Sequence, residues 1–548
     1  MLAAMSLPPT TAPPGDETPV RGRDDACPGA LRLHPADDGA LARVRVPGGL
    51  LTARQALVLA GVAEELGDGR LDLTSRGNLQ LRGLDAGCAA GLAARLRAAG
   101  LLPSDRHDRV RNIVASPLSG LDGAGHADAP AWARALDALL YDEVPAGSGF
   151  AELAGLSGRF LFALDDGRGD VSALGADVTL IATPDGEAVL RLGSAGGHGL
   201  ARADSTAPNA ADSPDTTDRP DATDHSGATD HSGATGVAAR RAGRAAGDDT
   251  PSRARPPGPP GLGDGPSGAE LLVRAEDAPR AAALAAVAFL DAVRASGTRA
   301  WRVRELPARH AVTADRLAGR LAAAGIQATP LGPQSPTTTA GTPAADPTPA
   351  VGLVVGPDGR CAVSVAVPLG RLSATQWRLL AGLASRGGSG ELRVTPWRGV
   401  VLPGFSPDEA RAALRELADA GLVATPHSPW LGIAACTGRP GCAKSLADVR
   451  ADAARAVAGA VARAVAGAAS GDGRPDPPPD QGPPPGRPPV YFSGCERRCG
   501  HPGGRWVDVL ATGDGYQVAV RDPGGFTPGV DVTADQLAGA VASARGTT

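Results

Sequence analysis

Two pairs of cysteines near the C-terminal end carry the clearest chemistry in this sequence. Five residues separate Cys436 from Cys442, and three separate Cys495 from Cys499. Each pair lies in a glycine-rich loop, so four thiolates can surround one metal centre while backbone N–H groups approach the sulfur atoms. Zinc sites favour two to four intervening residues, whereas iron–sulfur sites accept more varied loops. The spacing predicts a four-iron four-sulfur cluster at these cysteines, with zinc as the alternative.

A polar, arginine-containing face is the second candidate site. The stretch from Leu73 to Leu84 reads as one extended strand, LTSRGNLQLRGL. Side chains alternate faces along a strand, so long hydrogen-bonding residues share one face and leucines the other. That face has no acid to balance its arginines and therefore favours a planar anion over plain solvation. It comprises Arg76, Asn78, Gln80 and Arg82, and Arg43 and Arg45 share a face of an earlier strand.

An internal repeat positions this face. Residues 44–49 (VRVPGG) align without a gap with residues 365–370 (VAVPLG), and Leu81 and Gly83 fall on Leu402 and Gly404. Two copies of one α+β module should pair about a pseudo-twofold axis. The second copy replaces the polar face by Trp397, Gly399, Val401 and Pro403, so the face is a specialisation of the first copy.

Bulk composition narrows the function classes. The chain has 548 residues and a net charge of −5, which argues against a general nucleic-acid binder. No apolar run approaches the ~20 residues of a membrane span, and the N-terminal residues lack signal-peptide features. We therefore expect a cytoplasmic protein. The seven cysteines are too few and too clustered for a disulfide scaffold, and Cys27, Cys88 and Cys361 are interpreted as ordinary small residues.

Helical and strand periodicities predict an α+β fold. Expected helices include 52–66, 88–99, 131–141, 278–295 and 445–469. Expected strands include one within 109–120 that runs into a Pro/Gly turn, and those at 159–164, 176–183 and 490–493. A turn of sequence DDGRGD separates the second and third of these strands. The expected domains are half-domain repeats at 27–100 and 351–425, a domain at 101–200 continued at 269–329, and a cysteine-bearing domain at 426–548. Disorder is expected at 1–26, 201–268, 330–350 and about 470–489.

These motifs together resemble the sulfite/nitrite reductase superfamily. The resemblance rests on T-S-R-x-N-x-Q-x-R in the first repeat, the two cysteine pairs, and RNI-x-x-SP at Arg111. It implies two ferredoxin-like half-domain repeats, two sulfite-reductase-like domains, and a tetrapyrrole beside the cluster. By position, the tetrapyrrole carboxylates would meet Arg43, Arg45, Arg76, Asn78, Gln80, Arg82, Arg111, Asn112 and Arg159. Substituting Arg76 or Arg82 by alanine should then weaken tetrapyrrole binding and leave the cluster intact.

Within the superfamily, two branches are compared. Sulfite and nitrite reductases carry a K-F-K-like segment that binds the oxyanion over sirohaem, and here it reads Arg159-Phe160-Leu161. The segments CPG at Cys27, LRLHPADDGALARVRVPGG and SGCERRCGHP instead resemble the precorrin-3B synthase family. That branch implies oxygen-dependent hydroxylation of precorrin-3A at C20 with γ-lactone formation in cobalamin biosynthesis. The alternative is a sirohaem-dependent sulfite or nitrite reductase.

The same resemblance implies further cofactors and partners. Precorrin-3A and dioxygen would be substrates, and electrons would come from a ferredoxin or an NADH-dependent reductase. No GxGxxG motif links an expected strand to an expected helix, so nicotinamide binding by this chain is not expected. The branch adds a mononuclear non-haem iron as a candidate cofactor. Its ligands stay open, as do the catalytic residues; His34, His126, Asp128 and His501 are the side chains considered.

Overall fold

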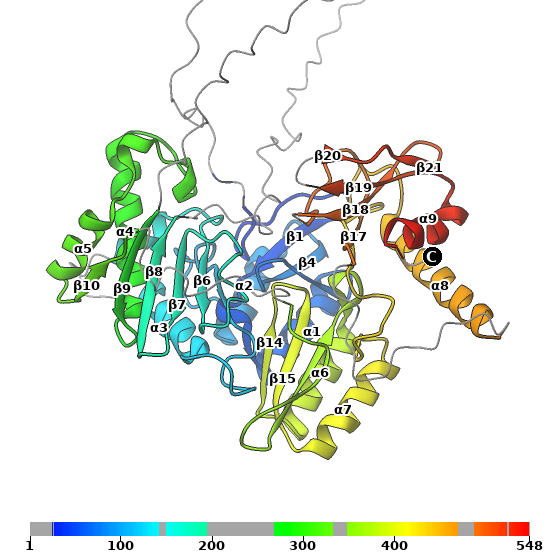
Figure 1. The fold of residues 1–548 in the computed structure, drawn as a ribbon, viewed down its shortest axis with the longest axis horizontal. Coiled ribbons are helices and arrows are strands. Elements are labelled where there is room, and N and C mark those ends of the chain that lie inside the picture. Colours follow the sequence, from blue (N-terminus) through cyan, green and yellow to red (C-terminus); the bar gives the residue numbers. More distant parts are fainter. Residues whose placement is uncertain are drawn as a thin grey trace, which may run out of the picture. The chain divides into compact units, whose positions relative to one another are not determined.

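Helices and strands of the α+β class run through the described chain (Figure 1). The computed structural model describes residues 25, 27–141, 150–193, 268–332, 348–469, 487–502, 504–522 and 525–546. The segments expected to be disordered lie largely outside these ranges. Among the described helices, none combines the length and the apolar character needed to cross a membrane.

The first half domain contains a strand, a helix and a β-hairpin, followed by a second helix. Helix α1 begins after Thr52 because a capping box forms there: Thr52 accepts from the Gln55 N–H, and the Gln55 side chain accepts from the Thr52 N–H. Its apolar side face, including Leu59 and Val62, is buried in the core of the paired half domains. The elements are β1 (Ala40–Val44), β2 (Leu50–Thr52), α1 (Ala53–Leu66), β3 (Arg70–Leu73), β4 (Leu79–Leu84) and α2 (Ala89–Ala98).

The second half domain repeats these elements and their local chemistry. Ser373 and Gln376 form the same capping box at the start of its first helix. Where the first copy has Gly48 in the left-handed region, the second has Leu369 at φ 54°, so the turn persists without its glycine. The elements are β11 (Gly352–Val355), β12 (Cys361–Ala366), β13 (Arg371–Ser373), α6 (Ala374–Arg386), β14 (Glu391–Val394), β15 (Gly399–Phe405) and α7 (Pro407–Asp419).

The two half domains exchange a strand reciprocally. Strand β13 of the second copy pairs with β3 of the first, and β2 of the first pairs with β14 of the second. The central partners are Leu372 with Leu71 and Leu51 with Leu392, which are equivalent positions in the repeat. Helices α1 and α6 pack together between the two sheets, and the indole of Trp377 donates to the carbonyl of Ala56 across the interface at 2.8 Å. This reciprocity confirms the predicted pseudo-twofold pairing.

The stretch from Leu73 to Leu84 is a hairpin, so the prediction of a single strand is wrong. Strand β3 ends at Leu73 and β4 begins at Leu79, and the two pair antiparallel. Gly77 adopts φ 65°, and the Thr74 hydroxyl accepts from the N–H of Asn78 at 3.1 Å. A serine or threonine turn closed by a left-handed glycine reverses the chain here. Arg76 and Asn78 therefore lie in the turn, and only Gln80 and Arg82 lie on β4.

The first mixed-sheet domain lies between the half domains in sequence. Its strand order is β10-β9-β8-β7-β6-β5, with β5, β6 and β7 parallel and the rest antiparallel. In Figure 1, β10, β9, β8, β7 and β6 lie side by side. Its elements are β5 (Ile113–Ala115), α3 (Ala129–Tyr141), β6 (Phe162–Asp165), β7 (Val178–Ala182), β8 (Glu187–Leu192), β9 (Ala269–Arg274), α4 (Ala278–Ser296), α5 (Ala314–Ala323) and β10 (Ala328–Pro330).

The second mixed-sheet domain carries the cysteine pairs. Its sheet has the order β16-β17-β18-β19-β20, with β21 also paired to β19, and its first three strands are parallel. Its elements are β16 (Ile433–Ala435), α8 (Val449–Ala469), β17 (Val490–Ser493), β18 (Trp506–Ala511), β19 (Tyr516–Asp522), β20 (Gly525–Phe526), β21 (Val530–Val532) and α9 (Leu537–Ala544).

Two predicted boundaries differ in the structure. The strand expected to run from Arg109 into a Pro/Gly turn is confined to β5, and the expected turn follows it, closed by the Ser119 N–H, which donates to the Ser116 carbonyl at 3.3 Å. The helix expected from Ser445 begins at Val449, because the Ser445 hydroxyl bonds the Ala447 carbonyl and Asp448 accepts from the Ala451 N–H. Local side-chain bonds thus replace the first helical turn.

Candidate functional site

The two cysteine loops meet at one edge of the second mixed sheet. Strands β16 and β17 are parallel and adjacent, so the residues that follow them emerge side by side. The Cys436 N–H donates to the Phe492 carbonyl at 3.0 Å, and the Gly494 N–H donates to Cys436 Sγ at 3.2 Å. A side chain on Gly494 would collide with Ser445, which is why the loop approaches so closely at a glycine. The fold therefore brings the loops of both predicted pairs together.

The four thiols influence one another electrostatically. Burial raises the pKa of Cys436, the N–H groups of Gly494 and Gly438 oppose this, and the nearby Cys495 and Cys442 raise it further. Burial, and then the charges of Cys495 and Cys436, also raise the pKa of Cys499. Thiolates at these positions would repel one another, and a cationic metal centre would offset that repulsion. All four are free of disulfides.

Four cysteine thiols are the donor set that an iron–sulfur cluster takes. No three His, Cys, Asp or Glu side chains of the described chain come together tightly enough to hold a single metal ion. A polynuclear cluster needs thiolates farther apart than a single zinc ion does, and it benefits from N–H groups directed at sulfur. Cys436, Cys442, Cys495 and Cys499 would hold such a cluster, which remains a proposal.

The first half domain contacts the cysteine loop directly. The Arg82 guanidinium on β4 donates to both carboxylate oxygens of Asp38, at 2.8 and 2.7 Å, and to the Gly441 carbonyl at 2.9 Å. The Ala443 N–H, just after Cys442, donates to Asp37 at 2.5 Å. Arg82 is only 4% exposed, so its ion pair is shielded from water. This contact anchors the first cysteine loop to the predicted polar strand.

A second arginine borders the cysteines from their own domain. Arg450, in the first turn of α8, donates to the Cys436 carbonyl at 3.3 Å and lies 3.4 Å from Asp72 of β3. Burial lowers the pKa of Arg450, and the Asp72 carboxylate opposes that effect. A cation beside the sulfur ligands favours the more negative, reduced form of a metal centre.

Three of the nine predicted anion-binding residues donate to the backbone of residues 158–160, which includes a fourth, Arg159. Arg45 donates to the Gly158 carbonyl at 3.3 Å, Arg76 to the Arg159 carbonyl at 3.2 Å, and Asn112 to the Phe160 carbonyl at 3.1 Å. The guanidinium of Arg159 stacks over Trp301, 4.7 Å from the ring centroid. Arg43 and Gln80 join through a bond of 3.5 Å between their side chains.

Three predicted residues have their polar groups occupied within the protein. The Asn78 amide donates to Asn112 at 2.8 Å and accepts from the Val46 N–H at 3.0 Å, so the pair links the hairpin turn to β5. Arg111 forms two bonds with Asp137 on α3, at 2.6 and 2.7 Å, away from the others. Such interactions stabilise the site's frame, and ligand contact by these residues stays a prediction.

The position of Arg82 changes one expectation from the sequence. Because Arg82 holds the Gly441 carbonyl, its substitution is no longer expected to leave the cysteine loop undisturbed. Arg76 donates to the Arg159 carbonyl at 3.2 Å, and its substitution keeps the expectation of weaker tetrapyrrole binding with an intact cluster.

A buried thiol lies between two of these arginines, and sequence reasoning treated it as an ordinary small residue. Cys27 Sγ accepts from Arg45 at 3.3 Å and from Arg43 at 3.7 Å. Burial alone would raise the pKa of Cys27, but the charges of Arg45 and Arg43 outweigh it and the pKa lies below its usual value. The only signal in the sequence was the CPG segment ahead of the two-arginine strand.

We expect Cys27 to ionise at lower pH than Cys88, whose pKa is raised by burial and by Asp85. Alkylation by iodoacetamide at each pH, quantified by peptide mass spectrometry, should give a lower midpoint for Cys27. Arg45→Met should raise that midpoint and leave Cys88 unchanged, since Cys88 serves as an internal control. Equal midpoints for the two thiols in the native protein would show that the guanidiniums do not act on the sulfur.

Arg45 has hydrogen-bonding capacity left over. It is 2% exposed, and its Nε and Nη1 atoms have no hydrogen-bond acceptor among the described residues. An incompletely paired guanidinium in the interior is costly, so an anionic ligand is the natural partner for it.

Leu161, which follows the Arg159-Phe160 pair, belongs to an apolar cluster. It is 4% exposed and packs with Val114, Ala163, Val171, Leu174 and Ala176, and Trp397 of the second half domain packs against the same cluster. Leu161 therefore presents an aliphatic side chain at the position where a K-F-K-like segment would place its second lysine.

The histidines considered for a mononuclear iron lie apart. Asp128 accepts from the Ala131 N–H at the start of α3, His126 lies beside Gly167, and His501 stacks on Trp506 at 5.1 Å. Burial, and then the Arg43 charge, lower the pKa of His34. These contacts identify no set of iron ligands within the part of the chain that is described.

Comparisons with known proteins match this geometry. The model of the nitrite/sulfite reductase ferredoxin-like half domain matches residues 34–99 and again residues 355–420. A ferredoxin–nitrite reductase from Synechococcus elongatus is 39% identical over 131 residues, 23% of this chain and 25% of the relative. One from Leptolyngbya laminosa is 45% identical over 82 residues, 15% of this chain and 16% of the relative. A precorrin-3B synthase from Sinorhizobium sp is 36% identical over 124 residues, 22% of this chain and 26% of the relative.

The solved structure of the NirA protein of Mycobacterium tuberculosis shares the fold. It has a TM-score of 0.59 at 19% sequence identity and covers 91% of this chain and 79% of its own. The sequence matches, by contrast, span only about a quarter or less of the curated relatives. The duplicated half domain and the fold predicted from the sequence are confirmed.

Proposed function

We propose that this chain, which contains two nitrite/sulfite reductase ferredoxin-like half domains, is a precorrin-3B synthase. The proposed reaction is the oxygen-dependent hydroxylation of precorrin-3A at C20 with γ-lactone formation, in the biosynthesis of cobalamin. The tetrapyrrole is then a substrate that enters and leaves, and sirohaem is not a resident cofactor. The match to the precorrin-3B synthase of Sinorhizobium sp is consistent with this assignment.

The apolar cluster around Leu161 carries the choice of branch. Reduction of sulfite or nitrite concentrates negative charge on an oxyanion and needs cationic groups close to it. Leu161 is surrounded by aliphatic side chains where the resemblance to the reductases would place a lysine. An apolar wall suits the face of a macrocycle better than a small oxyanion.

The proposed roles of this chain's residues follow from their contacts. The incompletely paired guanidinium of Arg45 would bind a carboxylate of the precorrin rim, with Arg43, Arg76 and Arg159 close by. Charge-assisted bonds of this kind are geometrically specific and stronger than neutral ones. A four-iron four-sulfur cluster, when bound by the four cysteines, supplies electrons one at a time.

Electrons would reach the cluster from a separate donor, a ferredoxin or an NADH-dependent reductase. Cys499 is the exposed member of the cysteine set, whereas the other three are half-buried. The exposed thiolate gives a donor the shortest route to the cluster. A cytoplasmic location and a mononuclear non-haem iron remain part of the proposal, the latter without assigned ligands.

A ferredoxin-dependent nitrite reductase is the second candidate. The 45% identity to the enzyme of Leptolyngbya laminosa, over 82 residues, favours it. Under that alternative, sirohaem would be bound beside the cluster, and Arg76 and Arg159 would bind the oxyanion.

Isolation under anaerobic conditions followed by a single turnover with isotopically labelled dioxygen tests the choice. The proposed function predicts iron and sulfide, no sirohaem absorption, and label in a hydroxylated product of precorrin-3A. Sirohaem retained through purification, together with reduction of nitrite, would sink the proposal in favour of the reductase. A product without label would contradict it independently.

A further inference from the structure

The loops at the edge of the first mixed sheet repeat the frame of the cysteine loops. In both domains a short strand leads into a loop and a helix, and the next parallel strand leads into a second loop. Three hydrogen bonds recur in matching positions. The Ser116 N–H donates to the Leu164 carbonyl (3.0 Å) as the Cys436 N–H does to the Phe492 carbonyl (3.0 Å), and the Asp166 N–H donates to Ser116 Oγ (3.2 Å) as the Gly494 N–H does to Cys436 Sγ (3.2 Å). The His126 N–H donates to the Asp166 carbonyl (2.6 Å) as the Leu446 N–H does to the Gly494 carbonyl (2.8 Å).

At the positions of Cys436 and Cys442 the first domain has oxygen-bearing side chains, whereas Gly167 and Val171 stand at the positions of Cys495 and Cys499. Ser116 takes the place of Cys436, and Asp122 follows Ser116 at the same spacing as Cys442 follows Cys436. In the second loop, three residues separate Asp166 from Asp170, as three separate Cys495 from Cys499. Each aspartate lies one position before the place that corresponds to the cysteine. Oxygen donors do not hold an iron–sulfur core, which requires thiolates.

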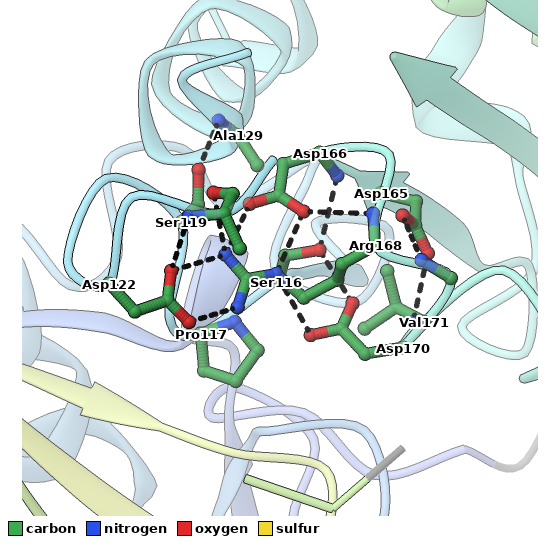
Figure 2. A network of polar contacts seen from close by, with 12 residues as sticks. Ser116, Pro117, Ser119, Asp122, Ala129, Asp165, Asp166, Arg168, Asp170 and Val171 are labelled. Carbon is green, nitrogen blue, oxygen red and sulfur yellow. Dashed lines mark hydrogen bonds and ion pairs between the residues drawn. The ribbon is translucent and has the colours of Figure 1, made fainter. Parts of the chain in front are cut away.

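The centre of these oxygen donors is filled by one guanidinium (Figure 2). Arg168 donates from Nε and Nη2 to the two oxygens of Asp166 at 2.9 and 2.8 Å, and from Nη1 and Nη2 to those of Asp122 at 2.8 and 3.1 Å. It also donates to the Ala124 carbonyl at 3.1 Å, and Asp170 lies 3.9 Å away. Asp166 is fully buried and the Arg168 side chain is 14% exposed, so the charges offset each other away from water.

The neighbouring acids are also accommodated. Asp165 is fully buried and accepts four backbone N–H groups, those of Gly167, Gly169, Val171 and Ser172. The Ser116 hydroxyl donates to Asp170 at 2.6 Å. Burial, followed by the Asp165 charge, raises the pKa of Asp170 to about 7, so this carboxyl is partly neutral near physiological pH.

Each half domain covers the edge loops of a different mixed-sheet domain. The first contacts the cysteine loop through Arg82 and the Gly441 carbonyl. The second contacts the Arg168 loops through Arg393, which donates to the carbonyls of Pro117 and Ser119 at 3.0 and 2.8 Å. The two contacts use different positions of the repeat, since Pro403 aligns with Arg82 and Asp72 with Arg393, so only the pairing of a half domain with one set of loops recurs.

We infer that the Arg168 network is the counterpart of the cluster site, in which the guanidinium takes the place of the inorganic core. The inference rests on the cluster of the proposed function and concerns the first mixed-sheet domain, where Arg168 joins the two equivalent loops. The Arg168 guanidinium is a cation that links the loop of Asp122 to the loop of Asp166, as a cluster would link the two cysteine loops. Its removal should uncover a latent site for a hard divalent cation, because Asp122, Asp166 and Asp170 would then face one another without a counter-charge.

Calcium binding to the full chain tests this inference. Wild type should give no heat from this site in a calcium chloride titration, whereas Arg168→Ala should bind one Ca²⁺ with a dissociation constant below about 1 mM. Arg168→Ala with Asp122→Asn should lose that binding. The melting temperature of Arg168→Ala should fall by roughly 10 °C, and calcium should restore part of the loss. All variants should keep the roughly four iron atoms per chain that one cluster supplies, besides any mononuclear iron.

Several outcomes would overturn the inference. If the wild-type protein binds calcium and Asp122→Asn abolishes that binding, the loops already hold a cation site. About eight iron atoms per chain would indicate a second cluster. If Arg168→Ala melts at the wild-type temperature and calcium does not change that temperature, the guanidinium does not take the place of an inorganic core. If that variant does not fold, Arg168→Lys decides: the retained charge should restore folding, and failure of both contradicts a role as cation. Wild type lacking iron would sink the proposed function but not the calcium result.

Discussion

Replacing Cys436 by serine is expected to abolish cluster binding, with iron and sulfide content falling below about a tenth of the wild-type value. Cys436 directly follows β16, and its sulfur accepts from the Gly494 N–H of the neighbouring loop at 3.2 Å. A serine oxygen is a harder and far less acidic ligand than a thiol, so it neither ionises nor matches iron in a sulfide cluster. Iron analysis and visible absorbance of the anaerobically purified variant measure the loss.

Cys361→Ser is the matched control. Cys361 is buried in β12 of the second half domain, as deeply as Cys27 and with no other cysteine among its described contacts. The Cys361→Ser substitution makes the same atomic change in a core position. It therefore measures the loss of stability caused by a buried hydroxyl while the predicted ligands stay unchanged. Full iron content in Cys361→Ser alongside full iron content in Cys436→Ser would contradict the assignment of the cysteine loops.

Arg82→Ala is expected to destabilise the protein by about 3–5 kcal/mol, because it leaves the Asp38 carboxylate without its partner in a largely buried position. The side chains of Arg82 and Asp38 are 5% and 20% exposed. Loss of the bond to Gly441 should also loosen the cysteine loop and lower iron retention. Urea unfolding followed by tryptophan fluorescence measures the first effect, since Trp377 lies between the half domains.

Arg97→Ala provides the comparison for Arg82→Ala. Arg97 binds Asp105 through the same Nε and Nη2 atoms, but these side chains are 44% and 58% exposed. Its loss should cost no more than about 1 kcal/mol. The double variant Arg82→Met/Asp38→Leu should recover most of the stability, since no buried charge is left unpaired, without restoring the loop contact. Equal costs for Arg82→Ala and Arg97→Ala would refute the argument from burial.

The sequence predicted those parts of the fold that depend on short-range patterns. The helix after Thr52 was predictable because its cap, its glutamine and its apolar spacing are local, and the repeat was visible because equivalent turns kept equivalent residues. The hairpin at Gly77 was missed because alternation of leucines continues on both sides of the turn. Only the conformation of one glycine and one threonine hydroxyl breaks the strand there.

The partners of individual arginines could not be predicted from spacing. Arg82 and Arg111 both follow alternating patterns, yet Asp38 and Asp137 occupy their guanidiniums after the chain has folded. Cys27 was set aside because its neighbours in space, Arg43 and Arg45, are distant in sequence from it and gain their effect only when buried. The DDGRGD turn was recognised as a turn, but its relation to the cysteine loops required the three-dimensional frame.

The reciprocal exchange of strands has a consequence for biosynthesis. The open edge of β3 finds its partner β13 only after about 300 further residues have been synthesised. At ordinary rates of translation this interval lasts roughly 15–60 s, during which an unpaired strand edge invites non-native association. The first half domain cannot complete its sheet as the ribosome releases it, and it depends on the second copy to finish folding. The two halves therefore form one folding unit, and cutting the chain between them is expected to leave both halves prone to aggregation.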